Sequence, residues 1–105
     1  MTQEILTGIV IDERVELSVR DVCHACGSSA EWVVELVHEG VLDAKGDGTE
    51  EWRFSGATLS RAIRARRLQR ELDLSLHGVA LVLGLMDEIE SLRRQLERLS
   101  AANKS

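Results

Sequence analysis

The 105-residue sequence predicts a mainly α-helical protein: a winged helix-turn-helix with a short N-terminal strand, a β-wing and a long C-terminal helix. Three observations lead to this fold class. Near the start of the chain, two stretches with apolar residues at helical spacing are joined by glycine and serine. A glycine-rich turn between apolar segments follows them. Near the end, leucine and isoleucine recur at spacings of 4, 3, 4 and 3 residues, as in a coiled coil.

The N-terminal part of the chain predicts a strand and then a helix. Residues 5–11 are apolar and largely β-branched, which favours a short strand within an N-terminal segment of residues 1–17. Ser18 is a suitable N-cap for the helix that follows, and Gly27 is a suitable residue to end it. The positions of this helix that share one apolar face are Val19, Val22, Cys23 and Cys26.

The second helix and the wing come next. Ser28 and Ser29 offer two N-caps for a helix that ends at Gly40, and the two helices together form a helix-turn-helix pattern. The apolar positions of the second helix are Val33, Val34, Leu36 and Val37. A turn-rich stretch over residues 45–49 then separates an apolar pair from the alternating segment 52–54. This pattern predicts a hairpin, the β-wing.

Two further helices complete the predicted fold. Ser55 or Thr58 caps a helix that runs to about Leu72, and Ser75 caps the last helix after a short break. The seam of this last helix consists of Leu85, Ile89, Leu92, Leu96 and Leu99. Because the seam is too long to be covered by the residues before it, we expect it to be a dimer interface. The alternative is that it folds back onto the helix-turn-helix of its own chain.

A chain of this size predicts a single domain, residues 1–105. Within it we distinguish the strand segment 1–17, the helix-turn-helix and wing 18–55, and the helical part 56–100. The composition, 44% hydrophobic and 30% charged, is typical of a globular protein. No basic segment precedes an apolar stretch at the start, and no apolar run approaches the roughly 20 residues of a transmembrane helix. We therefore expect a cytoplasmic protein that has no membrane association.

Charge is distributed unevenly along the chain, whose net charge is −5. Residues 1–50 contain eleven acidic and three basic residues, a net of −8, whereas residues 51–105 contain ten basic and seven acidic residues, a net of +3. An acidic surface repels phosphate and attracts a basic protein. The arginines of the third helix do not offset this, since they point all around the helix and predict solvated side chains. They are Arg61, Arg64, Arg66, Arg67 and Arg70.

The second helix carries the predicted partner-binding residues. Glu31, Glu35 and Glu39 stand at i, i+4 and i+8 and form a stripe of carboxylates, where a DNA-reading helix presents basic and small polar groups. Direct nucleic-acid binding is therefore not expected. The alternative to a partner-binding role is that the stripe is an ordinary solvated helix face. Trp32 and Trp52 complete the set, because tryptophan is enriched in interface hot spots. Trp52 has a second interpretation, in which it clamps the wing onto the core.

The helix-turn-helix half also resembles a known family. Ser18 through Leu42 resembles the DNA-reading half of the MerR family of transcriptional regulators, and Trp52-Arg53-Phe54-Ser55 resembles that family's wing strand. Where MerR-like proteins commonly place a phosphate-binding arginine, this sequence has Val34. The resemblance implies a MerR-like winged helix-turn-helix and an antiparallel dimer through the last helix. A DNA-binding transcriptional regulator is the alternative function that it implies.

The second half is similar to the CbpM family of chaperone modulators. The residues that carry the resemblance are Trp52-x-Phe54, Arg61-Ala62-x-Arg64, Glu71-Leu72-x-Leu74, Gly78-Val79-Ala80-Leu81 and Leu85-Met86-Asp87-Glu88-Ile89. The resemblance covers about residues 18–100. It implies a regulator that binds the J-domain of a DnaJ-type co-chaperone and inhibits its action with Hsp70. J-domains carry a basic helix that docks on Hsp70, and an acidic face can compete with Hsp70 for this helix. An adaptor with a different protein partner is a further alternative.

The sequence predicts no enzyme, cofactor or metal site. Cys23-His24-Ala25-Cys26 has the Cys-x-x-Cys spacing, but tetrahedral zinc needs two further ligands, and a second cysteine pair is missing from the sequence. We expect these cysteines to be buried thiols; a redox couple and a metal site are the alternatives. The stretch Gly46-Asp47-Gly48 lacks the spacing of a phosphate-binding loop.

Overall fold

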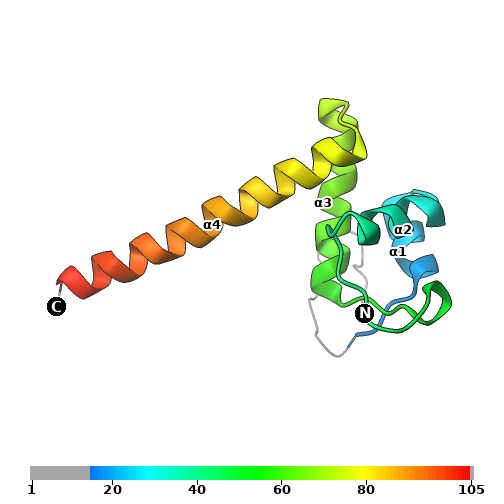
Figure 1. The fold of residues 1–105 in the computed structure, drawn as a ribbon, viewed down its shortest axis with the longest axis horizontal. Helices are drawn as coiled ribbons and strands as arrows, with labels where there is room; N and C mark the ends of the chain where they lie inside the picture. Colours follow the sequence, from blue (N-terminus) through cyan, green and yellow to red (C-terminus); the bar gives the residue numbers. More distant parts are fainter. Residues whose placement is uncertain (1–14, 105) are drawn as a thin grey trace.

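The computed structural model describes residues 15–104, so the strand predicted over residues 5–11 lies outside the described residues. The elements are α1 (Val19–Cys26), α2 (Ala30–His38), a 3₁₀ turn η1 (Thr49–Glu51), α3 (Gly56–Leu72) and α4 (Leu76–Lys104). Helices α1, α2 and α3 form the body of the molecule, and α4 leaves it as a long arm (Figure 1).

A serine N-caps each of the four helices, which confirms the predicted starts. The side-chain oxygen of each serine accepts a hydrogen bond from the backbone N–H three residues later. The four caps are Ser18, Ser29, Ser55 and Ser75. The first cap is a capping box, because the Asp21 carboxylate accepts a hydrogen bond of 2.9 Å from the Ser18 backbone N–H. Gly27 ends α1 in the left-handed conformation, with φ of 65°, as predicted.

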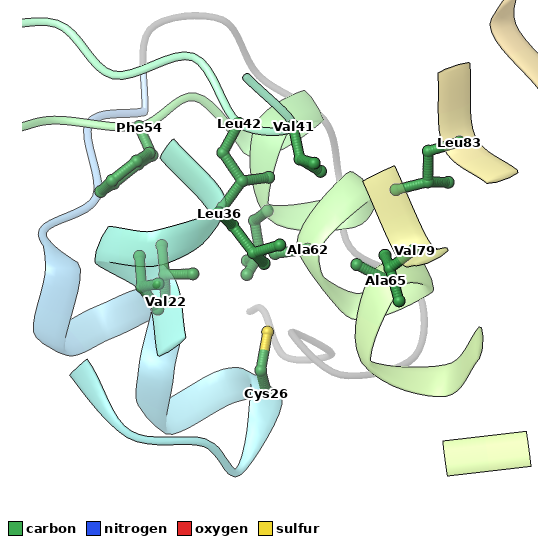
Figure 2. Close-up of a cluster of buried hydrophobic side chains, with 12 residues drawn as sticks. Val22, Cys26, Leu36, Val41, Leu42, Phe54, Ala62, Ala65, Val79 and Leu83 are labelled. Atoms are coloured by element: carbon green, nitrogen blue, oxygen red, sulfur yellow. The ribbon is translucent and has the colours of Figure 1, made fainter. Parts of the chain in front are cut away.

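Helix α3 lies at the centre of the hydrophobic core. Its residues Ala62 and Ala65 are fully buried, and their small side chains let neighbouring helices approach closely. Figure 2 shows Ala62 beside Leu36 of α2 and Ala65 beside Val79 of α4. The remaining core side chains come from every helix and from the segments beside them: Val22, Cys26, Val33, Val41, Leu42, Phe54, Leu59 and Leu83.

The predicted β-wing is wrong in its detail, because residues 15–104 contain no strand. Two isolated antiparallel bridges stand in its place, Lys45 with Arg53 and Leu17 with Phe54. The turn η1 occupies the segment just before Trp52, so the two sides of the loop pair at a single position. Phe54 instead exchanges backbone hydrogen bonds of 2.7 and 2.8 Å with Leu17, which precedes α1. The loop is therefore held mainly by the buried Phe54 ring, which is 1% exposed.

The loop also contains two glycines that make a matched pair of test positions. Gly46 has φ of +120°, and a β-carbon there would collide with the Glu51 carbonyl oxygen. A β-carbon at Gly48 would meet no atom of the described residues within 4 Å. We therefore predict that Gly46→Ala lowers the free energy of unfolding by about 1–3 kcal/mol, because the strain cannot be relieved without moving backbone.

Gly48→Ala serves as the control and should stay within about 0.5 kcal/mol of the parent. Urea denaturation of the two variants and the unmodified chain measures the difference. Equal stabilities of the two variants would contradict the loop geometry described above.

Candidate functional site

The carboxylate stripe predicted on α2 is present and faces solvent. Val33 and Leu36 bury the opposite side of the helix, so Glu31 and Glu35 are exposed. Glu39 is the C-cap of α2, and its Oε1 lies 3.2 Å from Nδ1 of His77 in the first turn of α4. The stripe thus runs along α2 and ends beside the base of the arm. We call Glu31, Glu35 and Glu39 the acidic face.

Trp32 belongs to the first turn of α2 and Trp52 lies beside His38 at the end of α2, and both are half-buried. The Trp32 indole Nε1–H donates a hydrogen bond of 2.8 Å to the side-chain oxygen of Gln69 on α3. The Trp52 ring stands edge-on to His38 and to Phe54, with ring centres 6.1 and 6.3 Å apart. Trp52 therefore packs the wing against α2, as its second interpretation predicted. Neither indole lies free in solvent, and the partner-binding role of both stays a prediction.

The wing adds carboxylates that the helix pattern does not reveal. Asp47, Glu50 and Glu51 are all exposed in the loop. Irregular spacing hides them from a periodicity analysis, although the local acidic composition is a signal that could have found them. The wing arginine, Arg53, donates hydrogen bonds to the carbonyls of Glu50 and Trp52, at 3.4 and 2.7 Å. Its guanidinium is thus engaged with the backbone of the wing itself.

The five arginines of α3 differ in their surroundings. Arg64, Arg67 and Arg70 are exposed, whereas Arg61 and Arg66 are half-buried. Arg61 makes a bidentate ion pair with Asp87 of α4, at 3.0 and 2.9 Å. This pairing of an arginine with a carboxylate joins two helices, which the sequence pattern could not specify.

The predicted seam on the last helix is exposed. Leu85, Ile89, Leu92, Leu96 and Leu99 are between 49% and 65% exposed, and the fold-back alternative is therefore wrong. The core-facing residues Val79 and Leu83 explain this, since they anchor α4 by another face. Leu81 is 64% exposed and extends the seam by one turn toward the body, which the 4-3-4-3 pattern missed. We call Leu81 and the five predicted residues the apolar seam.

The two cysteines are free thiols, Cys26 buried and Cys23 half-buried. Burial raises the pKa of Cys26 from 9.0 to about 11, and the nearby Arg66 acts in the opposite direction. Residues 15–104 include no group of three or more histidine, cysteine, aspartate or glutamate side chains that could hold a metal ion. Within the same residues, no helix has the length and apolar character needed to cross a membrane.

Comparisons with known proteins complete this picture. A family model described as "MerR HTH family regulatory protein" matches residues 17–101. The Chaperone modulatory protein CbpM of Pseudomonas entomophila (strain L48) is 38% identical over 81 residues, which are 77% of this chain and 80% of that protein. That of Coxiella burnetii (strain Dugway 5J108-111) is 30% identical over 99 residues, 94% of this chain and 93% of that protein.

The chain belongs to the CbpM family of MerR-like helix-turn-helix proteins. The resemblance found in the sequence is thereby confirmed. CbpM relatives are named as modulatory proteins and the matching family as regulatory, and neither name describes an enzyme.

The two thiols of this CbpM-family chain should differ in reactivity. Thiolate is the reactive form, and the raised pKa of Cys26 together with its burial keeps it protonated and covered at pH 8. We predict that iodoacetamide labels Cys23 well before Cys26 in the native protein, and that both react alike in urea. The variants Cys23→Ser and Cys26→Ser assign the two rates. Equal native rates would contradict the buried position of Cys26.

The same pKa predicts a pH dependence of stability. The folded state favours the protonated thiol, so its contribution is fully present below pH 9 and is lost as the pH rises from 9 to about 11. The free energy of unfolding should therefore fall more steeply over this range in the unmodified protein than in Cys26→Ala, by urea denaturation.

Proposed function

We propose that this chain modulates a DnaJ-type co-chaperone by binding its J-domain through the acidic face, and that it inhibits the action of the co-chaperone with Hsp70. The observation that carries the proposal is the exposed stripe of Glu31, Glu35 and Glu39 on the helix that reads DNA in helix-turn-helix regulators. The names of the relatives support a chaperone-modulating role.

Electrostatics favours a basic protein partner over DNA on this surface. Placing three carboxylates about 4–8 Å from phosphates would cost several kcal/mol at low ionic strength. The wing carboxylates Asp47, Glu50 and Glu51 add to the same repulsion. The same charges attract the basic helix of a J-domain and steer its approach. The tryptophans at the borders of α2 then offer partly exposed ring surface for contact once the partner has arrived.

Inhibition follows from competition for one surface. If the basic helix of the J-domain is the part that docks on Hsp70, a chain bound to that helix excludes Hsp70 from it. An interface dominated by exposed charges forms rapidly and weakens with salt. The modulator therefore acts as a reversible competitor, and its occupancy depends on the concentrations of both partners.

Neutralising the acidic face tests this proposal. In the triple variant Glu31→Gln, Glu35→Gln and Glu39→Gln, we predict about tenfold or greater loss of J-domain affinity and a flatter salt dependence, because each lost charge removes part of the attraction. The helices should stay intact, since glutamine has a similar helix propensity. Isothermal titration calorimetry at several salt concentrations measures both quantities.

The arm offers a matched control with the same change in net charge. Glu88→Gln, Glu90→Gln and Glu97→Gln remove three exposed carboxylates outside the acidic face and should leave J-domain affinity nearly unchanged. Equal losses in the two triple variants would mean that net charge rather than the acidic face drives binding. An unchanged affinity in the first triple variant would mean that the interface lies elsewhere, with the wing around Trp52 as the next candidate.

We also propose that the arm pairs with a second copy of the chain to form an antiparallel homodimer. The apolar seam exposes six large aliphatic side chains on one face of α4, and a monomer leaves them in water. The body cannot cover the seam, because Val79 and Leu83 hold α4 by a face about 160° away from Leu81 and Leu85. A second arm supplies the missing apolar surface.

A charge placed in the seam should separate the two copies. We predict that Leu96→Asp gives a folded monomer, because an unpaired carboxylate cannot stay in an apolar interface but is solvated in the free arm. Ala101→Asp is the control, since residue 101 is exposed and lies about 140° around the helix from residue 96. Light scattering measures the mass of each variant. An unmodified protein that is already monomeric at about 100 μM would contradict the dimer.

A further inference from the structure

Arg61 is bonded to two other parts of the fold at once. Its Nε–H donates a hydrogen bond of 2.6 Å to the carbonyl of Val41, just after α2. Its two terminal nitrogens donate to the two carboxylate oxygens of Asp87 on the arm, at 3.0 and 2.9 Å. One guanidinium therefore joins the end of α2, the middle of α3 and the arm. Its planar, fork-shaped donors fix direction as well as distance.

The bond to Val41 reaches the segment that ends the acidic face. The backbone N–H groups of Val41 and Leu42 both donate to the Leu36 carbonyl, at 2.9 and 3.3 Å, so the last turn of α2 sets the position of this segment. Glu39 stands two residues before Val41. Arg61 is therefore bonded to the segment that directly follows the third carboxylate of the acidic face.

The bonds to Asp87 act at the other end, where α4 leaves the core. Leu83 is the last buried residue of α4, and Asp87 follows one turn later. Asp87 lies about 160° around the helix from both Leu85 and Ile89, so it holds the arm from behind the apolar seam. The ion pair therefore leaves that seam open to a second copy while it bonds the arm to α3.

We propose that Arg61 is a positioning residue that fixes the arm relative to the acidic face, so that the two proposed interaction surfaces are presented in one geometry. The contact of His77 with Glu39 is a second link between the base of the arm and the acidic face. The effect on J-domain binding rests on the proposed function, whereas the effect on arm direction does not. Because Asp87 is 56% exposed, its pairing contributes little to stability, and orientation is the property it controls.

Asp87→Asn is the test variant, because it weakens the link to the arm and leaves the bond between Arg61 and Val41 in place. Glu97→Gln is the matched control, an exposed carboxylate of the same helix. Spin labels at Ala30→Cys on α2 and Arg94→Cys on the arm report arm direction, in full-length protein with Cys23→Ala, Cys26→Ala and Leu96→Asp. Leu96→Asp keeps the protein monomeric, so that each molecule in solution carries only its own two labels.

The expected result is a narrow distribution of label distances in the parent and in Glu97→Gln, and a clearly broader one in Asp87→Asn. Arg61→Lys keeps the positive charge but loses the bidentate geometry, and it should broaden the distribution as well. The midpoint of thermal unfolding of Asp87→Asn should remain within a few degrees of the parent. An unchanged narrow distribution in Asp87→Asn, or an equal broadening in Glu97→Gln, would overturn the proposal.

J-domain affinity, measured by calorimetry on chains without labels or the seam mutation, separates the two proposals. Asp87→Asn should raise the dissociation constant for the J-domain about fivefold, which corresponds to the free energy of a favourable exposed ion pair. Glu97→Gln should leave the dissociation constant unchanged. An unmodified chain that binds no J-domain contradicts the proposed function, and the label distances then decide the role of Arg61 alone. Binding that is unaffected by Asp87→Asn overturns the coupling to the acidic face.

Discussion

The close packing of helices against α3 is the constraint on which the other features depend. Ala62 and Ala65 are fully buried, and because their side chains are small, α1 and α4 both approach α3 closely, while α2 packs against α1 and α4. Leu36 of α2 and Val79 of α4 belong to the same hydrophobic core (Figure 2). Once these faces are buried, the opposite faces of both helices have to lie in solvent. The acidic face on α2 and the apolar seam on α4 are therefore consequences of one core.

The backbone and the charge of this molecule point to different uses of the same fold. The family match over residues 17–101 and the order of helices are those of a helix-turn-helix regulatory protein. Carboxylates occupy the surface that would meet phosphates, and the wing arginine Arg53 is bonded to carbonyls of its own loop. A fold fixes the shape of a surface, whereas the side chains on it decide which partner it attracts.

Local patterns were enough to predict much of this structure. Serine caps specify helix starts through hydrogen bonds between residues three apart in the sequence. For α2 the sequence left Ser28 and Ser29 open, and Ser29 is the cap. Long-range partners could not be predicted, because nothing local encodes them. The hydrogen bond from Trp32 to Gln69 spans 37 residues, and the ion pair between Arg61 and Asp87 spans 26. Through these contacts Trp32 and Arg61, the latter predicted to be solvated, link helices to one another.

Paired titrations of the unmodified chain decide whether the acidic face selects a basic protein over DNA. The chain is titrated into an isolated J-domain of a DnaJ-type co-chaperone from the same cell and into duplex DNA, over a series of salt concentrations. We expect J-domain binding that weakens as salt rises, and no measurable DNA binding near physiological salt. Sequence-selective DNA binding, or no J-domain binding even at low salt, would contradict this expectation.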